Sequence, residues 1–258
     1  MNCIFCKENS DSSISKEHII PESLGNSEHI LPKGVVCDRC NSYFAIKIEK
    51  ELLNQPYFRY IRFAQDIFSK KGKAIPGLAF IGHPKGGIID IYRDSDGIFI
   101  NVSSPEIADV IVSEKVNKLY ILRLTEPFAD NVALSRLLGK MAIEALTKKI
   151  LHIEGWETEI IDKSELDPLR SFVRYGPGKI KFWKYSQRLL YSPTHLFKTE
   201  SDELYEVLHE YTFHYSEKNE LFFIIAIFGV EYAINLSSPE IDSYSQIIRS
   251  NSDRSLLY

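Results

Sequence analysis

The sequence predicts an α+β fold in two parts. The first is a zinc-stabilised segment over residues 1–70, and the second is a larger α+β domain over residues 77–258 with an antiparallel sheet and a central core helix. Three observations carry this prediction. All four cysteines lie near the N-terminus in two C-x-x-C pairs, and apolar residues recur at helical spacing over residues 132–151. Strand-like runs then follow at residues 204–214, 221–228 and 231–236.

The cysteine pairs have the spacing of a tetrahedral zinc site. Each C-x-x-C pair can place two thiolates on one Zn²⁺ ion at about 2.3 Å. The gap between the pairs is about twice the roughly 15–20 residues common in zinc ribbons, so the ion closes a loop large enough to hold functional residues. A purely structural zinc ribbon requires the same ion. We therefore expect a structural Zn²⁺ site formed by Cys3, Cys6, Cys37 and Cys40.

The residues around the cysteine pairs predict the order strand, loop, strand and helix. Residues 15–20 and 30–36 are typical of short strands, and a glycine-containing turn lies between them. Apolar residues at helical spacing begin after the second cysteine pair. Asn41 or Ser42 is the expected N-cap of that helix. All of these elements are expected to wrap around one zinc ion.

Together these residues resemble the zinc-bearing branch of the HNH endonucleases, the ββα-metal nucleases. Three features match in the right order: the two C-x-x-C pairs, the segment Glu-His-Ile-Ile-Pro at residues 17–21, and the junction of Cys40 with Asn41. The resemblance covers residues 1–55. The family usually carries aspartate where this chain has Glu17, whose longer side chain changes the reach to a metal ion.

The resemblance implies a metal-dependent phosphodiesterase with one catalytic histidine. His18 is the expected general base that takes a proton from the attacking water, because the ordinary pKa of histidine lies near 6.5. Glu17 and Asn41 are the expected ligands of one catalytic divalent ion, Mg²⁺ or Mn²⁺, which would act as a Lewis acid on the phosphate. Asn26 and His29 lie where the family keeps a supporting amide and a second imidazole.

Each of these residues also has a structural interpretation. His18 can be a histidine satisfied after a strand, Asn41 a helix N-cap and Glu17 a solvated carboxylate. His29 can be a bystander on the loop. The joint occurrence of the acid, the histidine and the asparagine with two cysteine pairs favours the nuclease interpretation.

Basic and aromatic residues are interleaved just after the predicted helix. Such a stretch can follow a phosphate backbone and support base stacking, whereas an amphipathic helix with buried aromatic residues and solvated lysines remains the alternative. Residues 1–75 hold 11 basic and 9 acidic residues against 20 and 26 in the remainder, which indicates an anion-facing N-terminal part. The expected backbone contacts are Arg39, Arg59, Arg62, Lys70, Lys71 and Lys73.

The larger C-terminal part carries no sequence pattern of a second active site. It contains neither a glycine-rich phosphate loop nor a G-x-S-x-G motif. Tyr211, Phe213 and Tyr215 alternate on one predicted strand, as an aromatic binding face or as an ordinary sheet face. Residues from Asn251 onward are expected to fray. The expected roles of this part are target recognition, signal sensing or oligomerisation, through a second copy of the chain or a regulatory partner.

The function that these patterns favour is a divalent-metal-dependent HNH endonuclease acting on double-stranded DNA, in bacterial restriction or anti-phage defence. A zinc-stabilised nucleic-acid-binding module without catalysis and an RNA-cleaving toxin are the alternatives. The longest apolar run, residues 221–229, is far shorter than the roughly 20 residues that span a bilayer, so no membrane partner is expected. No signal peptide is expected, because the first cysteine pair follows Met1 and Asn2 without an apolar run, and cysteines used for zinc fit a reducing cytoplasm.

Overall fold

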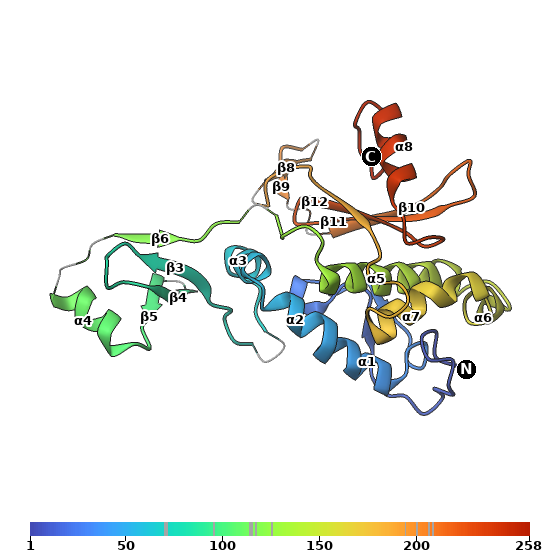
Figure 1. Ribbon diagram of the computed structural model, residues 1–258, viewed down its shortest axis with the longest axis horizontal. Coiled ribbons are helices and arrows are strands. Elements are labelled where there is room, and N and C mark those ends of the chain that lie inside the picture. The colour runs from blue at the N-terminus through green and yellow to red at the C-terminus, as the bar shows by residue number, and fades with distance from the viewer. Residues whose placement is uncertain are drawn as a thin grey trace. The chain divides into compact units, whose positions relative to one another are not determined.

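A computed structural model of the chain (Figure 1) divides by its internal contacts into two compact units. Unit 1 comprises residues 1–22, 26–52 and 128–258, and unit 2 comprises residues 23–25 and 53–127. Unit 1 therefore contains most of the nuclease-like segment together with the C-terminal half of the chain. The interval between the two predicted parts, residues 70–77, lies inside unit 2. The structure describes residues 1–69, 72–94, 96–113, 116, 118–124, 126–193, 195–199, 201–205, 207 and 209–258.

The N-terminal part of unit 1 has the predicted order of strand, loop, strand and helix, with shorter strands than expected. β1 (Glu17–His18) pairs antiparallel with β2 (Ile30–Leu31). α1 (Asp38–Phe44) continues into a π-helical stretch (Ala45–Glu49) and then into α2 (Lys50–Leu53). Residues of α1 and of the π-helical stretch are thus carried on one continuous helical segment.

The N-cap of α1 is Cys37, so the prediction of Asn41 or Ser42 as the cap is wrong. The sulfur of Cys37 accepts a hydrogen bond from the amide of Cys40 at 3.4 Å. The helix starts at least four residues earlier than expected because a cysteine sulfur, not an amide or hydroxyl oxygen, accepts from one of its first amide groups. This start places Asn41 inside α1, where its side chain is available for contacts other than capping.

A long buried helix, α5 (Val132–Ile150), lies at the centre of unit 1 and confirms the predicted core helix. Fourteen of its 19 residues are buried, so it is covered on most of its circumference rather than along one stripe. α6 (Trp156–Ile160) and α7 (Asp167–Tyr175) follow it. A side chain at Gly139 would approach Val173 of α7 to 2.8 Å, which shows how closely α5 and α7 pack.

The C-terminal sheet of unit 1 is antiparallel, with the strand order β10-β11-β12-β7. It lies between α5 and α8 (Asp242–Ser250), as Figure 1 shows. Because both faces are covered, β11 and β12 are buried almost throughout. The predicted meander is confirmed in β10, β11 and β12. The predicted first strand, residues 204–214, is too long, because residues 204–205 form β9, which pairs with β8 in a separate sheet. Neither β7 nor β8 was predicted. The strands are β7 (Tyr185–Leu189), β8 (Phe197–Lys198), β9 (Leu204–Tyr205), β10 (His209–Tyr215), β11 (Leu221–Ile227) and β12 (Val230–Asn235).

The C-terminal tail is anchored, so the expectation that it frays is wrong. The hydroxyl of Ser255 donates to the buried carboxylate of Glu231. The same carboxylate accepts from Arg188 Nε at 2.5 Å and from the Tyr244 hydroxyl at 3.0 Å. A buried acid that needs several donors thus holds the chain end in place.

Unit 2 is a separate, smaller α+β unit with the strand order β5-β4-β3-β6. Ile107 and Ile111 of its second helix pack on the apolar core of this sheet. The predicted hairpin at residues 88–92 and 98–102 is confirmed as β4 and β5. Within the described parts of the chain, every helix is too short or too polar to cross a membrane. The elements of unit 2 are α3 (Pro56–Ala64), β3 (Gly77–Ile81), β4 (Ile88–Asp94), β5 (Gly97–Asn101), α4 (Pro105–Ser113) and β6 (Leu119–Ile121).

Candidate functional site

The four cysteines form one cluster in the fold. Their sulfur atoms all lie within 4.8 Å of one another, and those of Cys6 and Cys37 are 3.6 Å apart. A tetrahedral zinc ion with Zn–S bonds of about 2.3 Å holds its sulfurs about 3.8 Å apart, so the spacing fits. The amide of Cys37 also donates to the sulfur of Cys3 at 3.3 Å. Four sulfur donors match a closed structural zinc site.

Cysteine ligands of a metal ion must be thiolates, and the surroundings of the cluster favour the thiolate form at Cys3. A hydrogen bond from Cys40 lowers the pKa of Cys3 to about 5, although burial opposes this shift. Burial raises the pKa of Cys37, and the hydrogen bond to Cys3 raises the pKa of Cys40. Cys3 therefore carries a negative charge before Cys37 and Cys40, whose protons zinc binding would release.

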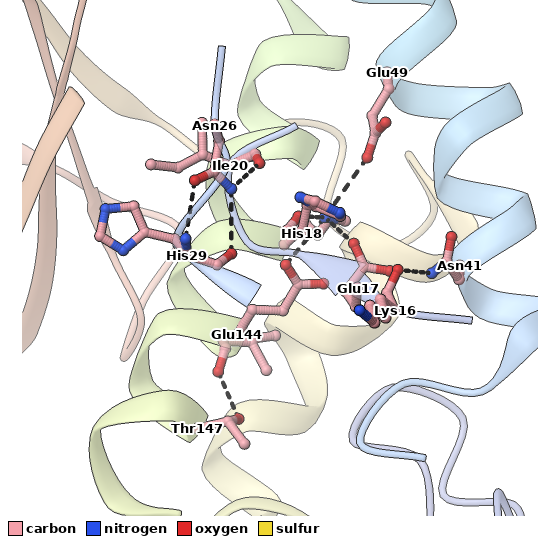
Figure 2. A network of polar contacts seen from close by, with 12 residues as sticks. Lys16, Glu17, His18, Ile20, Asn26, His29, Asn41, Glu49, Glu144 and Thr147 are labelled. Atoms are coloured by element: carbon pink, nitrogen blue, oxygen red, sulfur yellow. Dashed lines mark hydrogen bonds and ion pairs between the residues drawn. The ribbon is translucent and has the colours of Figure 1, made fainter. Parts of the chain in front are cut away.

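The fold brings the strand with Glu17 and His18 to the helix with Asn41 (Figure 2). The side-chain amide of Asn41 donates to the carbonyl oxygen of Lys16 at 3.0 Å, directly before Glu17. This bond uses the donor half of the amide, and its other half is an oxygen of the type that hard cations bind. His18 and Asn41 are half-buried and within reach of solvent, whereas Glu17 is only 4% exposed.

Glu17 forms an ion pair with a lysine that the sequence analysis did not identify. The ammonium nitrogen of Lys140, in the middle of α5, lies 2.6 Å from Oε1 of Glu17. It donates to the carbonyl oxygen of His18 at 3.1 Å and to Oε2 of Glu144 at 3.0 Å. It also lies 3.6 Å from Oε1 of Glu49, and its side chain is fully buried. We call these three glutamates with Lys140 the lysine cluster.

The lysine cluster keeps its ammonium charged. Burial alone would lower the pKa of Lys140, but the carboxylates of Glu144, Glu17 and Glu49 raise it above its ordinary value. Burial raises the pKa of Glu144 well above its ordinary value, which the nearby ammonium only partly offsets. Glu144 therefore binds a proton more readily than an ordinary glutamate, while Lys140 remains a cation.

The side chain of Asn26 stabilises the loop between β1 and β2 through hydrogen bonds to its backbone. Its amide nitrogen donates to the carbonyl oxygens of Ile20 at 2.7 Å and His29 at 3.2 Å. Its oxygen accepts from the backbone amides of Glu28 at 3.0 Å and His29 at 2.9 Å. The side chain is 2% exposed, so the expected supporting amide acts through the backbone of the loop.

His29 packs against the C-terminal sheet rather than toward His18 (Figure 2). Its ring centroid lies 5.1 Å from that of Tyr211 and 6.3 Å from that of His209, both on β10. Burial lowers the pKa of His29, and the positive charge of Lys148 lowers it further. The expected second imidazole is therefore placed where it joins the nuclease-like loop to β10.

Two of the arginines expected to contact phosphate are used within unit 2, one in an ion pair and the other buried. Arg62 is buried, and burial lowers its pKa. Arg59 pairs with Asp90 at 2.8 Å. The aromatic residues Tyr57 and Phe58 of α3 are also buried. In this helix the structure agrees with the alternative of an amphipathic helix whose aromatic face points inward.

The other expected phosphate contacts lie on the surface or outside the described residues. Arg39 is exposed in the second cysteine pair, and the neighbouring Cys6 raises its pKa. Lys73 is exposed as well. Lys70 and Lys71 lie outside the described residues. Arg39 is thus the predicted contact that the structure places beside the cysteine cluster.

Comparison with known proteins identifies the N-terminal segment. The model of the HNH endonuclease family matches residues 3–57. This segment contains the cysteine cluster, β1 and α1, so the resemblance is confirmed for the N-terminal region, and the family indicates nuclease activity. No curated protein and no solved structure matches the chain. Lys140 and Glu144 lie outside the matched segment.

Proposed function

We propose that the chain is a divalent-metal-dependent HNH endonuclease that hydrolyses phosphodiester bonds in double-stranded DNA. The observation that carries the proposal lies within the segment that matches the family. There the amide of Asn41 ties α1 to the strand that bears Glu17 and His18, beside a cysteine cluster with zinc spacing. The chemistry of the site follows from these residues.

His18 is the proposed general base. In the reaction, a water oxygen forms a bond to phosphorus while its proton passes to the imidazole. The bond from phosphorus to the leaving oxygen breaks, and that oxygen takes up a proton from solvent. His18 is half-buried, so part of the residue is open to solvent, whereas Nδ1 of its ring is buried.

Glu17 and Asn41 would hold one Mg²⁺ or Mn²⁺ ion. A carboxylate oxygen and an amide oxygen are the donors that such hard cations prefer, so the residues fit the ion. When bound, the ion would supply a Lewis acid for the scissile phosphate. Lys140 contacts one oxygen of Glu17 at 2.6 Å and so fixes the direction of the carboxylate.

The biological setting belongs to the same proposal. From the resemblance of the N-terminal segment to HNH endonucleases, we propose a nuclease of bacterial restriction or anti-phage defence. We propose a cytoplasmic location because the four cysteines are free thiols placed for zinc rather than disulfides. The sheet of unit 1 and the whole of unit 2 would recognise the target, bind a regulatory partner or pair two copies of the chain.

A plasmid-nicking assay tests the enzyme. Purified protein is incubated with supercoiled DNA and Mg²⁺, Mn²⁺ or EDTA, and wild type is compared with His18→Ala. Loss of the base should slow cutting by roughly 10²–10⁴-fold, whereas EDTA should abolish it. His152→Ala, an exposed histidine of the same unit, is the matched control and should cut like wild type.

The outcome also separates the proposal from its alternatives. Cutting that survives His18→Ala contradicts the assignment of the base. Modified phage DNA and single-stranded RNA are tested alongside, and cleavage of RNA alone would favour an RNA-cleaving toxin. Tight binding without any cutting would favour a zinc-stabilised binding module.

A further inference from the structure

The lysine cluster joins α5 to both elements of the proposed active site. Lys140 reaches β1 through the carboxylate of Glu17 and the carbonyl of His18. It reaches the helical segment that carries Asn41 through Glu49, the last residue of the π-helical stretch after α1. One ammonium group therefore contacts the strand and the helix that must be aligned for catalysis.

We propose that Lys140 is a positioning residue of the nuclease site, which holds Glu17 and the backbone of His18 in register with the helix that bears Asn41. This inference rests on the proposed function and deepens it. It assigns a role in the reaction to a residue more than 80 positions beyond the end of the matched segment. The proposed active site is then supported by β1, by α1 with the π-helical stretch after it, and by α5, all within unit 1.

Energetics argue against a role in stability alone. Burying an ammonium and several carboxyl groups carries a desolvation cost, and well-packed apolar residues in place of a buried ion pair are often neutral or stabilising. Around Lys140, α5 presents mostly apolar residues, which would pack without that cost. The ammonium group of Lys140 instead lies where α5 contacts Glu17 and His18. A directional contact at this place can orient the residues of the proposed active site.

Two arginines, one on α5 and one on α7, contact other parts of the N-terminal segment. Arg170 of α7 donates to the carbonyl of Ile4 at 2.7 Å, in the first cysteine pair. Arg136 donates to the hydroxyl of Tyr43 at 2.9 Å. These bonds support the cysteine pair and the outer side of α1. Among the contacts described here, Lys140 is the one that reaches the proposed metal ligand.

The test separates positioning from folding with a charge-compensated variant. Lys140→Met alone leaves buried acids without their cation, so it is combined with Glu144→Gln, which removes one acid of the lysine cluster. Thermal unfolding first shows that the double variant is folded. Mn²⁺ binding is then titrated by electron paramagnetic resonance, and DNA nicking is measured against the Mg²⁺ concentration.

We expect the folded double variant to bind Mn²⁺ roughly 10–100-fold more weakly and to cut correspondingly more slowly, as is typical when a partner that orients a metal ligand is lost. Compared with the double variant, Lys140→Arg should bind Mn²⁺ more tightly and cut faster, because arginine supplies a positive charge at this position. Glu231→Gln is the matched control, since it breaks a buried ion pair on β12 of the same unit. It should lower the melting temperature without changing Mn²⁺ affinity.

Two results would overturn the proposal. One is a folded double variant with wild-type Mn²⁺ affinity and cutting. The other is tighter Mn²⁺ binding, which would mean that Lys140 acts only as a repelling charge. If wild type binds Mn²⁺ but cuts no substrate, the proposed function fails while the metal titration still decides the role of Lys140. If wild type binds no Mn²⁺, both proposals fail.

Discussion

Two clusters hold the nuclease-like segment, and they differ in how far apart their residues lie in the chain. The cysteine cluster draws all its residues from positions 3–40. The lysine cluster joins Glu17 and Glu49 to Lys140 and Glu144 on α5. The first cluster shows in the sequence as a spacing pattern, whereas the second exists only once the chain has folded.

The clusters also differ in energetics. A structural zinc ion contributes directly to the folding free energy of the segment around it. A buried ion cluster contributes little net stability, but the loss of one partner leaves uncompensated charge in the core. The comparison therefore predicts that both clusters are sensitive to substitution, and that only the lysine cluster can be rescued by removing the opposite charge.

The largest effect is expected from the cysteine cluster. Cys6→Ser removes one ligand and should unfold much of residues 3–57, because zinc sites of this kind contribute about 10–16 kcal/mol in isolated zinc fingers. Native mass spectrometry reports the bound zinc, and hydrogen exchange reports protection in α1. Ser42→Ala, an exposed change in the same helix, should leave both unchanged. Full protection in α1 without zinc would contradict the prediction.

The second prediction tests whether removal of an opposite charge in the lysine cluster restores stability. Lys140→Met should lower the free energy of unfolding by about 3–5 kcal/mol, because it strands buried carboxyl groups. Adding Glu144→Gln should recover much of that loss. Urea denaturation measures both, with Lys149→Met, an exposed lysine of the same helix, expected to stay within ~0.5 kcal/mol of wild type. A double variant as unstable as the single one would show that charge compensation is not the cause.

The sequence predicted the cysteine cluster and the nuclease-like segment better than the contacts from α5 that hold this segment. Spacing alone identified the cysteines, and the family match confirms the segment in which Glu17, His18 and Asn41 lie. The predicted core helix, the C-terminal meander and the hairpin of unit 2 were also found, because strong periodicity marks them. Lys140 left a weaker signal, a lysine and a glutamate four residues apart within the otherwise apolar stretch of residues 137–146.

Long-range partners explain the rest of what the sequence did not show. The tail from Asn251 onward looked like a fraying end, yet Ser255 reaches a buried carboxylate on β12. Arg62 looked like a phosphate contact, yet it is buried in unit 2. Ser255 is held by a partner that is distant in the chain, and Arg62 is buried by the folding of its unit, and local composition reveals neither.

The smallest predicted effect lies at the contact between the nuclease-like loop and β10. Burial and Lys148 lower the pKa of His29 in the folded protein, so the folded state favours the neutral ring. The unfolded chain, with an ordinary histidine pKa near 6.5, takes up a proton more readily as the pH falls. Stability should therefore be complete above pH ~6.5 and decrease below it, down to the folded pKa.

His29→Gln should remove this part of the pH dependence while keeping a polar side chain beside Tyr211. Urea denaturation at pH 7.5, 6.5 and 5.5 measures the difference between the variant and wild type. His152→Gln, an exposed histidine of the same unit, is the matched control and should keep the wild-type profile. A contact between neutral rings would then explain why the loop meets β10 through a histidine: the loop is held firmly at neutral pH and more weakly in acid. An unchanged pH profile in His29→Gln would instead show that this contact carries no proton-linked stability.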